Sequence, residues 1–195
     1  MTAPDRPREV GADVKLAMVR LQTPLGDILI ELFLDRAPLS AGQFLRVVND
    51  EGNRGGRFWR TVRLDNDRGD PPIQVVQGAM EAGGAALPCV AHEPTSITGL
   101  RHRDGSVSLA RAEPGTASAA AFFICVGAQP ALDEGGLRNP DGLGFAAFGQ
   151  VVQGMEVVHG IHRGTTSPHA EVAYVRGQML ASPVGFTFTR AGRSP

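Results

Sequence analysis

Histidines at metal-ligand spacing are the first residues in this chain that could do chemistry. His159 and His162 lie three positions apart, and His169 and Glu171 follow shortly after them. Two histidines spaced in this way on a helix can bind one metal ion, but a protein zinc site needs at least a third ligand. No further residue stands at a spacing that completes the set, so we expect ordinary surface histidines. The sequence therefore predicts no metal and no cofactor.

Potential nucleophiles are also present, but none has the context that its chemistry needs. Ser106 and Ser108 lack the Gly-x-Ser-x-Gly context of a hydrolase nucleophile, so a catalytic triad is not supported. The segment 142–144 does not complete a dinucleotide-binding fingerprint and does not open a predicted helix. Cys89 and Cys125 have neither metal-ligand spacing nor a disulfide pattern, and Cys125 follows an apolar run that predicts a buried position.

A cation within a short apolar run is the remaining candidate. Arg60 follows Phe58 and Trp59 in a run that ends at Val62. A guanidinium is always charged and carries a rigid fork of donors, so it suits the stabilisation of an electron-rich atom during a reaction. Position alone leaves open that Arg60 is one of the chain's many surface arginines.

The elements that would position these residues are many short strands and two helices. Apolar residues alternate along 28–34 after a turn at 23–26, which predicts a two-stranded hairpin. Helical spacing of apolar residues predicts one helix from Ala37 to about Asn49 and another over 155–161. Further short apolar runs predict strands at 58–62, 73–77, 107–110, 122–126, 145–152, 172–175 and 184–189. This pattern is typical of a single β-barrel or sandwich with helical caps.

Length and composition predict one domain. The chain has 195 residues, 42% of them hydrophobic, which suffices for one core over 14–191 between a disordered arm (1–13) and a short tail (192–195). A net charge of −1 gives no basic excess to bind nucleic acid. No apolar run reaches the roughly 18 residues of a membrane span, and the arm lacks the apolar stretch of a signal peptide. We expect a cytoplasmic protein, although a chain from which an export signal had been removed would look the same.

Ten short segments match, in order, the pattern of one known protein family. They are 23–28, 31–33, 37–38, 44–45, 58–62, 77–78, 105–111, 122–124, 132–133 and 148–158. They cover most of the chain, and their shared order is more specific than any one of them. In these segments the chain resembles the cyclophilin family of peptidyl-prolyl cis-trans isomerases, in a divergent bacterial branch. The resemblance implies a mainly β fold, a closed antiparallel barrel of eight strands capped by two α-helices.

The resemblance also implies a reaction that needs no nucleophile and no proton transfer. The barrier to rotation about a peptide bond is about 18–20 kcal/mol, so X–Pro bonds isomerise slowly. A catalyst must bind the twisted amide better than either planar isomer. Twisting localises the lone pair on the prolyl nitrogen, and the resemblance assigns its stabilisation to Arg60 as the catalytic residue.

The same resemblance implies a set of substrate-binding residues around Arg60. Phe123 corresponds to the floor of the proline pocket and Leu132 to its wall, while Gln77 corresponds to a glutamine that braces the arginine and contacts the substrate backbone. Three further positions fall at the groove, namely Val75, Ala112 and Phe145.

Several positions depart from the family pattern. Gln74 stands where the family has a pocket phenylalanine, Ala121 where it has a glutamine, and Ala131 where drug-sensitive members carry tryptophan. Two segments, 65–72 and 134–144, look like insertions. These departures predict reduced activity and weak binding of cyclosporin.

The departures leave an alternative open. The chain could be a cyclophilin-like module that binds proline-containing segments, or a chaperone, with little or no turnover. The changes at Gln74 and Ala121 favour this alternative, whereas the retained Arg60, Phe123 and Gln77 oppose it. In either case the expected partners are proline-containing peptides and unfolded protein chains, with no nucleic acid and no membrane, and the expected state is a monomer.

Overall fold

The computed structural model describes most of the chain, over residues 16–50, 52, 55–81, 89–111, 113–118, 120–170 and 172–191. The arm expected at 1–13 and the tail expected at 192–195 lie outside the described residues. Ala112, which was expected to line the groove, lies outside them as well.

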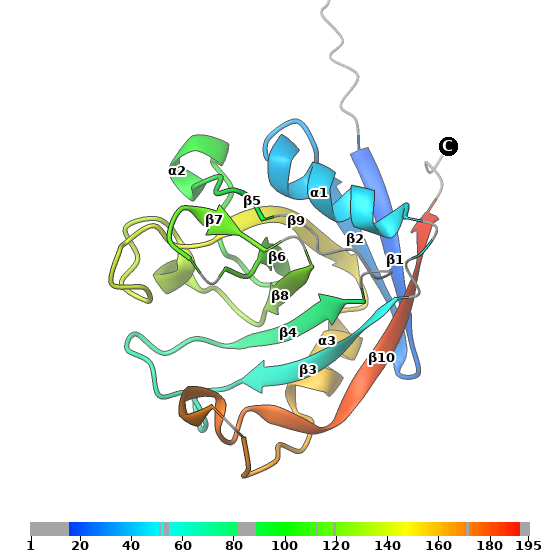
Figure 1. Cartoon of the computed structure of the whole chain (residues 1–195). Coiled ribbons are helices and arrows are strands. Elements are labelled where there is room, and N and C mark those ends of the chain that lie inside the picture. Colours follow the sequence, from blue (N-terminus) through cyan, green and yellow to red (C-terminus); the bar gives the residue numbers. More distant parts are fainter. Residues whose placement is uncertain are drawn as a thin grey trace, which may run out of the picture.

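Eight antiparallel strands close into a barrel, as the sequence predicts (Figure 1). The strand order is β1-β10-β3-β4-β8-β6-β9-β2, and β2 pairs back with β1. A separate two-stranded sheet joins β5 (Val90–Ala91) to β7 (Thr116–Ala117). The barrel strands are β1 (Leu16–Thr23), β2 (Gly26–Phe33), β3 (Gly56–Val62), β4 (Val75–Met80), β6 (Ser106–Leu109), β8 (Ala121–Cys125), β9 (Ala146–Gln153) and β10 (Met179–Ala191).

The first hairpin forms because its pattern and its turn agree. Ile28, Ile30 and Leu32 are fully buried and alternate with more exposed residues along β2, as expected for a strand with one face on the core. The Thr23 hydroxyl closes the turn, since it accepts a hydrogen bond from the Leu25 N–H and donates one to the Gly26 carbonyl. Gly26 has a φ of +127°, a conformation that favours glycine.

Helices cover the barrel on two sides. The predicted helices are α1 (Pro38–Val48), which packs on β2, β9 and β10, and α3 (Met155–His162), which packs on β2, β3 and β4 and is seen behind the last two in Figure 1. Phe44 of α1 anchors the core, because its ring centroid lies 5.4 Å from that of Phe122 and 5.0 Å from that of Phe148. A third helix that the sequence did not predict, α2, spans only Thr95–Thr98.

One predicted strand is wrong. Residues 172–175 form a bend and a short 3-10 helix, η2 (Ala173–Val175). Val172 and Tyr174 are 51% and 66% exposed, and only Val175 is buried, so the β-branched and aromatic residues here do not pack as a strand.

A second predicted strand begins two residues later than expected. The strand expected from Ile73 begins only at Val75, because the Ile73 N–H donates to the Asp67 carboxylate and the Gln74 N–H to the Gln129 side chain. These two amides are therefore used by side chains before β4 begins.

Candidate active site

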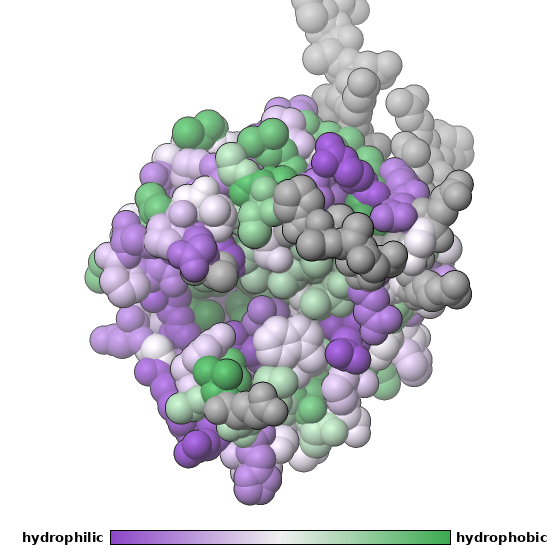
Figure 2. Space-filling view, in the orientation of Figure 1, coloured by the Kyte–Doolittle hydropathy of each residue, from purple (hydrophilic) through white to green (hydrophobic). Residues whose placement is uncertain are grey.

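A cavity of about 290 Å³ lies beside the barrel wall, where β3, β4 and β8 meet the loops before β4 and β9. The surface is hollowed on this side of the molecule, and apolar residues lie at the bottom between hydrophilic ones (Figure 2). The cavity is lined by Arg60, Val62, Ile73, Val75, Gln77, Ala110, Arg111, Phe123, Leu132, Arg138, Asn139, Phe145 and Tyr174. Six of the seven expected site residues therefore meet at one cavity, and the seventh, Ala112, is not described.

Neighbouring strands place Arg60 at the cavity beside its expected partner. Arg60 on β3 is the register partner of Gln77 on β4, and its Nη1 donates to the Gln77 Oε1 at 2.9 Å. The Oε1 of Gln178 accepts two further bonds, from Nε at 3.0 Å and from Nη2 at 2.6 Å. Burial is the main influence on the pKa of Arg60 and lowers it, but a guanidinium remains protonated at neutral pH.

A small apolar cluster separate from the main core forms the floor of the cavity. Phe123 is 5% exposed, and it is clustered with Val75 and Leu132, which are also buried. Phe145 packs edge-on against Phe123, with ring centroids 5.2 Å apart. Together these side chains form an apolar surface of the kind that a proline ring can pack against.

A buried polar network supports this floor from below. The His102 ring stacks on Phe123 at 5.9 Å, and its Nδ1 lies 2.8 Å from Asp133 Oδ1 while its Nε2 lies 3.1 Å from the Ser108 hydroxyl. Burial alone would raise the pKa of Asp133, but hydrogen bonds from the His102 ring and main chain outweigh it and lower the pKa. The ionised carboxylate can only accept, so the His102 Nδ1 donates to it.

This serine, histidine and aspartate have the order of a hydrolase triad but not its accessibility. Ser108 and the His102 ring are fully buried beneath Phe123, so no substrate can reach the hydroxyl. The network instead fixes the floor of the cavity. The sequence did not predict this network, because Ser108 lacks a nucleophile motif and Asp133 lies 31 positions from His102.

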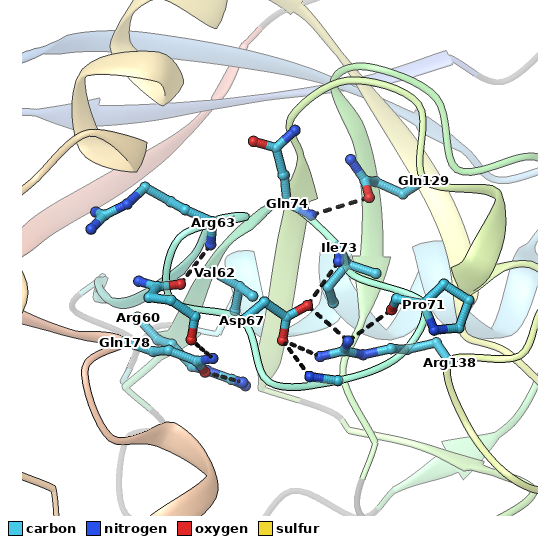
Figure 3. A network of polar contacts seen from close by, with 12 residues as sticks. Arg60, Val62, Arg63, Asp67, Pro71, Ile73, Gln74, Gln129, Arg138 and Gln178 are labelled. Atoms are coloured by element: carbon cyan, nitrogen blue, oxygen red, sulfur yellow. Dashed lines mark hydrogen bonds and ion pairs between the residues drawn. The ribbon is translucent and has the colours of Figure 1, made fainter.

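The two insertions are joined by a buried ion pair. Arg138 donates to both carboxylate oxygens of Asp67 at 2.8 Å and to the Pro71 carbonyl at 2.9 Å. Figure 3 shows Arg138 reaching across the loop to these acceptors. Because Arg138 and Asn139 line the cavity, the second insertion forms part of its wall, and Asp67 of the first insertion holds Arg138 in place there.

The substituted family positions lie away from this cavity. Neither Gln74 nor Ala121 is among the lining residues, and the Gln74 side chain points away from Arg60 in Figure 3. Ala131 packs against the apolar cluster of Phe123 and Leu132. Gln74 and Ala121 therefore contribute no side chain to the lining of this cavity.

The expectation of surface histidines is wrong for His162. Its side chain is buried, and its Nε2 donates to the Val62 carbonyl at 2.9 Å, which ties α3 to β3. Among the residues that the structure describes, no three His, Cys, Asp or Glu side chains lie close enough together to hold a metal ion. None of the helices in this described part has the length and apolarity needed to span a membrane.

Comparison with known sequences identifies the family of this barrel and cavity. The family model described as "Cyclophilin type peptidyl-prolyl cis-trans isomerase/CLD" matches residues 18–177. A peptidyl-prolyl cis-trans isomerase of Acinetobacter baylyi is 30% identical over 157 residues, which cover 78% of this chain and 75% of the relative. Peptidyl-prolyl cis-trans isomerase B of Escherichia coli is 28% identical over 165 residues, covering 80% and 92%.

Solved structures show the same fold. The crystal structure of a cyclophilin type peptidyl-prolyl cis-trans isomerase of Cryptosporidium parvum matches with a TM-score of 0.66 and 17% identity, over 92% of this chain and 99% of that one. A structure of that protein in the presence of the dipeptide Ala-Pro matches equally well. The chain belongs to the cyclophilin-type peptidyl-prolyl cis-trans isomerase family. Its activity is peptidyl-prolyl cis-trans isomerisation, as the sequence predicts.

Proposed function

We propose that Arg60 catalyses the isomerisation by stabilising the prolyl nitrogen of the twisted amide. One observation carries this assignment: within the part of the chain that the structure describes, Arg60 is the one of the three cavity-lining arginines that hydrogen-bonds only to neutral acceptors. Arg111 is paired with Asp141 and Arg138 with Asp67, whereas Arg60 bonds to two glutamine oxygens. The positive charge of Arg60 therefore has no carboxylate directly bonded to it.

The apolar floor supplies the second requirement, a fixed proline ring. With the ring against Phe123 and beside Val75, Leu132 and Phe145, the prolyl side of the amide is held while the preceding carbonyl group rotates. As the bond twists, the lone pair becomes localised on nitrogen and can accept a hydrogen bond from the guanidinium. No covalent bond to the enzyme forms and no proton is transferred.

The size of the effect follows from the kind of contact. A hydrogen bond to a charged group contributes about 1.5–3 kcal/mol, and each 1.36 kcal/mol removed from a barrier raises the rate about tenfold. If the bond forms only in the twisted state, Arg60 accelerates the reaction by roughly 10- to 100-fold. Gln77 holds the guanidinium from one side through its Oε1, and its Nε2 group can donate to the substrate backbone.

The partners follow from the site, whereas the location is proposed from the sequence. The floor and the cation suit proline-containing peptides and unfolded chains, taken up by a monomer of one domain (14–191) in the cytoplasm without nucleic acid or membrane. The bonded Arg60–Gln77 pair favours turnover over a module that only binds proline, because binding alone does not require an oriented cation.

A protease-coupled assay on an Ala-Pro peptide tests the two roles separately. Arg60→Ala should lower turnover by roughly 10- to 100-fold while the protein stays folded and binds peptide. Phe123→Ala should instead weaken peptide binding. Unchanged turnover in folded Arg60→Ala would remove Arg60 from the mechanism.

A further inference from the structure

Gln178 holds the catalytic guanidinium more extensively than Gln77 does. Its Oε1 accepts from both Nε and Nη2 of Arg60, at 3.0 and 2.6 Å, whereas Gln77 accepts a single bond. A guanidinium has five N–H donors, so these bonds use three of them. One N–H on each terminal nitrogen is left for the substrate.

The orientation of the Gln178 amide is itself fixed. The residue is 1% exposed, and its Nε2 donates to the Asn66 carbonyl at 2.9 Å. The opposite orientation of the amide would place an NH2 group against the guanidinium and a carbonyl oxygen against a carbonyl. The main-chain carbonyl of Gln178 also accepts a hydrogen bond from the Thr61 N–H at 2.9 Å, and Thr61 follows Arg60 on β3.

Asn66 links this contact to the first insertion. Its Nδ2 donates to the carbonyls of Thr61 and Gly177, and its Oδ1 accepts from the Arg63 N–H at 2.7 Å. The loop is thus joined to both the strand that carries Arg60 and the turn that carries Gln178. Figure 3 shows Gln178 lying beside Arg60 next to this loop.

The remaining neighbour of the guanidinium cannot replace Gln178. The Arg60 Cζ lies over the ring of Tyr174, 5.5 Å from its centroid, but Tyr174 is 66% exposed and this cation–ring contact is not a directed hydrogen bond that would orient the donors of Arg60. The in-plane rotation of the group is therefore fixed by the two glutamines, chiefly by Gln178.

We propose that Gln178 is a positioning residue for catalysis. It orients the unbonded N–H donors of Arg60 toward the prolyl nitrogen, and its bond to the Asn66 carbonyl makes this orientation depend on the loop that carries Asn66. This inference rests on the proposed role of Arg60. The matching family model covers residues 18–177 and so does not include Gln178.

The test compares Gln178→Met with the matched control Gln129→Met. Gln129 is another buried glutamine with two side-chain hydrogen bonds, to the Gln74 N–H and the Val126 carbonyl, and neither involves Arg60. A misplacement of about 1 Å in an active site can cost on the order of 100-fold in rate. We expect kcat/KM of Gln178→Met to fall roughly 10- to 100-fold, with the peptide dissociation constant within about twofold of the wild-type value.

A spectroscopic readout separates positioning from general damage. In the wild type the Arg60 Nε–Hε group donates to Gln178, so its NMR signal should be protected from exchange with water. The signal should lose this protection in Gln178→Met and keep it in Gln129→Met. If Gln178→Met does not fold, Gln178→Asn keeps a buried amide but withdraws it by one methylene, and the same two changes are expected.

The outcomes distinguish this inference from the role of Arg60. If Arg60→Ala lowers turnover roughly 10- to 100-fold while a folded Gln178 variant retains both wild-type kcat/KM and a protected Arg60 signal, the positioning role alone is overturned. A fall in kcat/KM that Gln129→Met reproduces would also overturn it. If Arg60→Ala itself leaves turnover unchanged, the proposed mechanism fails and the positioning role fails with it.

Discussion

Removing the Arg138 guanidinium should destabilise the protein through the carboxylate that it leaves behind. The Asp67 side chain is 1% exposed, and it accepts from the Ile73 and Gly69 N–H groups as well as twice from Arg138. Arg138→Met keeps much of the side-chain volume but removes both charged donors. Breaking a buried pair by removing one partner typically costs about 3–5 kcal/mol, because the other charge stays buried.

That magnitude is large for a protein of this size. Domains are stable by about 5–15 kcal/mol in total, and 1 kcal/mol shifts Tm by about 2–4 °C in chains of 150–250 residues. We therefore expect the Tm of Arg138→Met to fall by roughly 6 to 20 °C at pH 7. The double variant with Asp67→Asn should recover part of the loss, because it removes the unpaired charge.

The loss should also depend on pH in a defined direction. Burial on its own would raise the pKa of Asp67, but the hydrogen bonds from Arg138, Ile73 and Gly69 outweigh it and lower the pKa. A carboxyl whose pKa is lower in the folded state stabilises the fold above its unfolded pKa, which is about 3.9. This contribution is lost as the pH falls through the folded pKa. The difference between wild type and Arg138→Met should therefore shrink below about pH 4.

Urea unfolding at pH 7, and at the lowest pH at which the wild type stays folded, measures both effects. Arg68→Met is the matched control, because Arg68 lies in the same loop but is exposed, and among the described residues it donates to the Ala173 main-chain carbonyl alone. Its effect should stay within about 0.5 kcal/mol. A loss below about 1 kcal/mol in Arg138→Met, or a loss that persists unchanged at low pH, would refute the reasoning about the buried pair.

Three further predictions concern other sites. Cys89 is exposed, whereas burial strongly raises the pKa of the Cys125 thiol, so iodoacetamide should modify only Cys89 in the folded protein and both after denaturation. Burial lowers the pKa of His162, so its NMR titration should have a midpoint below 6.5. The folded state therefore binds the proton less readily than the unfolded state does. His162 should make the fold less stable as the pH falls from 6.5 through that midpoint. Ala131 offers no indole donor, so titration with cyclosporin should show only weak binding, and tight binding would contradict this reading of the groove.

The sequence predicts those parts of the fold that depend on near neighbours. The alternation of Ile28, Ile30 and Leu32 after a turn is local information, and the hairpin forms as expected. The segment 172–175 has the composition of a strand, but its packing is decided by contacts beyond the segment. Exposed Val172 and Tyr174 show that composition alone is not sufficient there.

The site was predictable only as far as the family resemblance carried it. Arg60, Gln77 and Phe123 lie on paired strands, so their meeting follows from the barrel. Gln178 lies 118 positions from Arg60, and Arg138 lies 71 positions from Asp67. Such contacts depend on how loops fold over the barrel, and no local pattern in the sequence encodes them.

The central claim is that Arg60 acts on the twisted amide rather than on the bound ground states. Exchange NMR on an Ala-Pro peptide, with wild type and with Arg60→Met, measures the cis–trans rate on the enzyme together with the affinity for each isomer. The mechanism predicts that the on-enzyme rate falls roughly 10- to 100-fold while both affinities change less than about twofold. An unchanged on-enzyme rate, or a loss confined to binding, would contradict it.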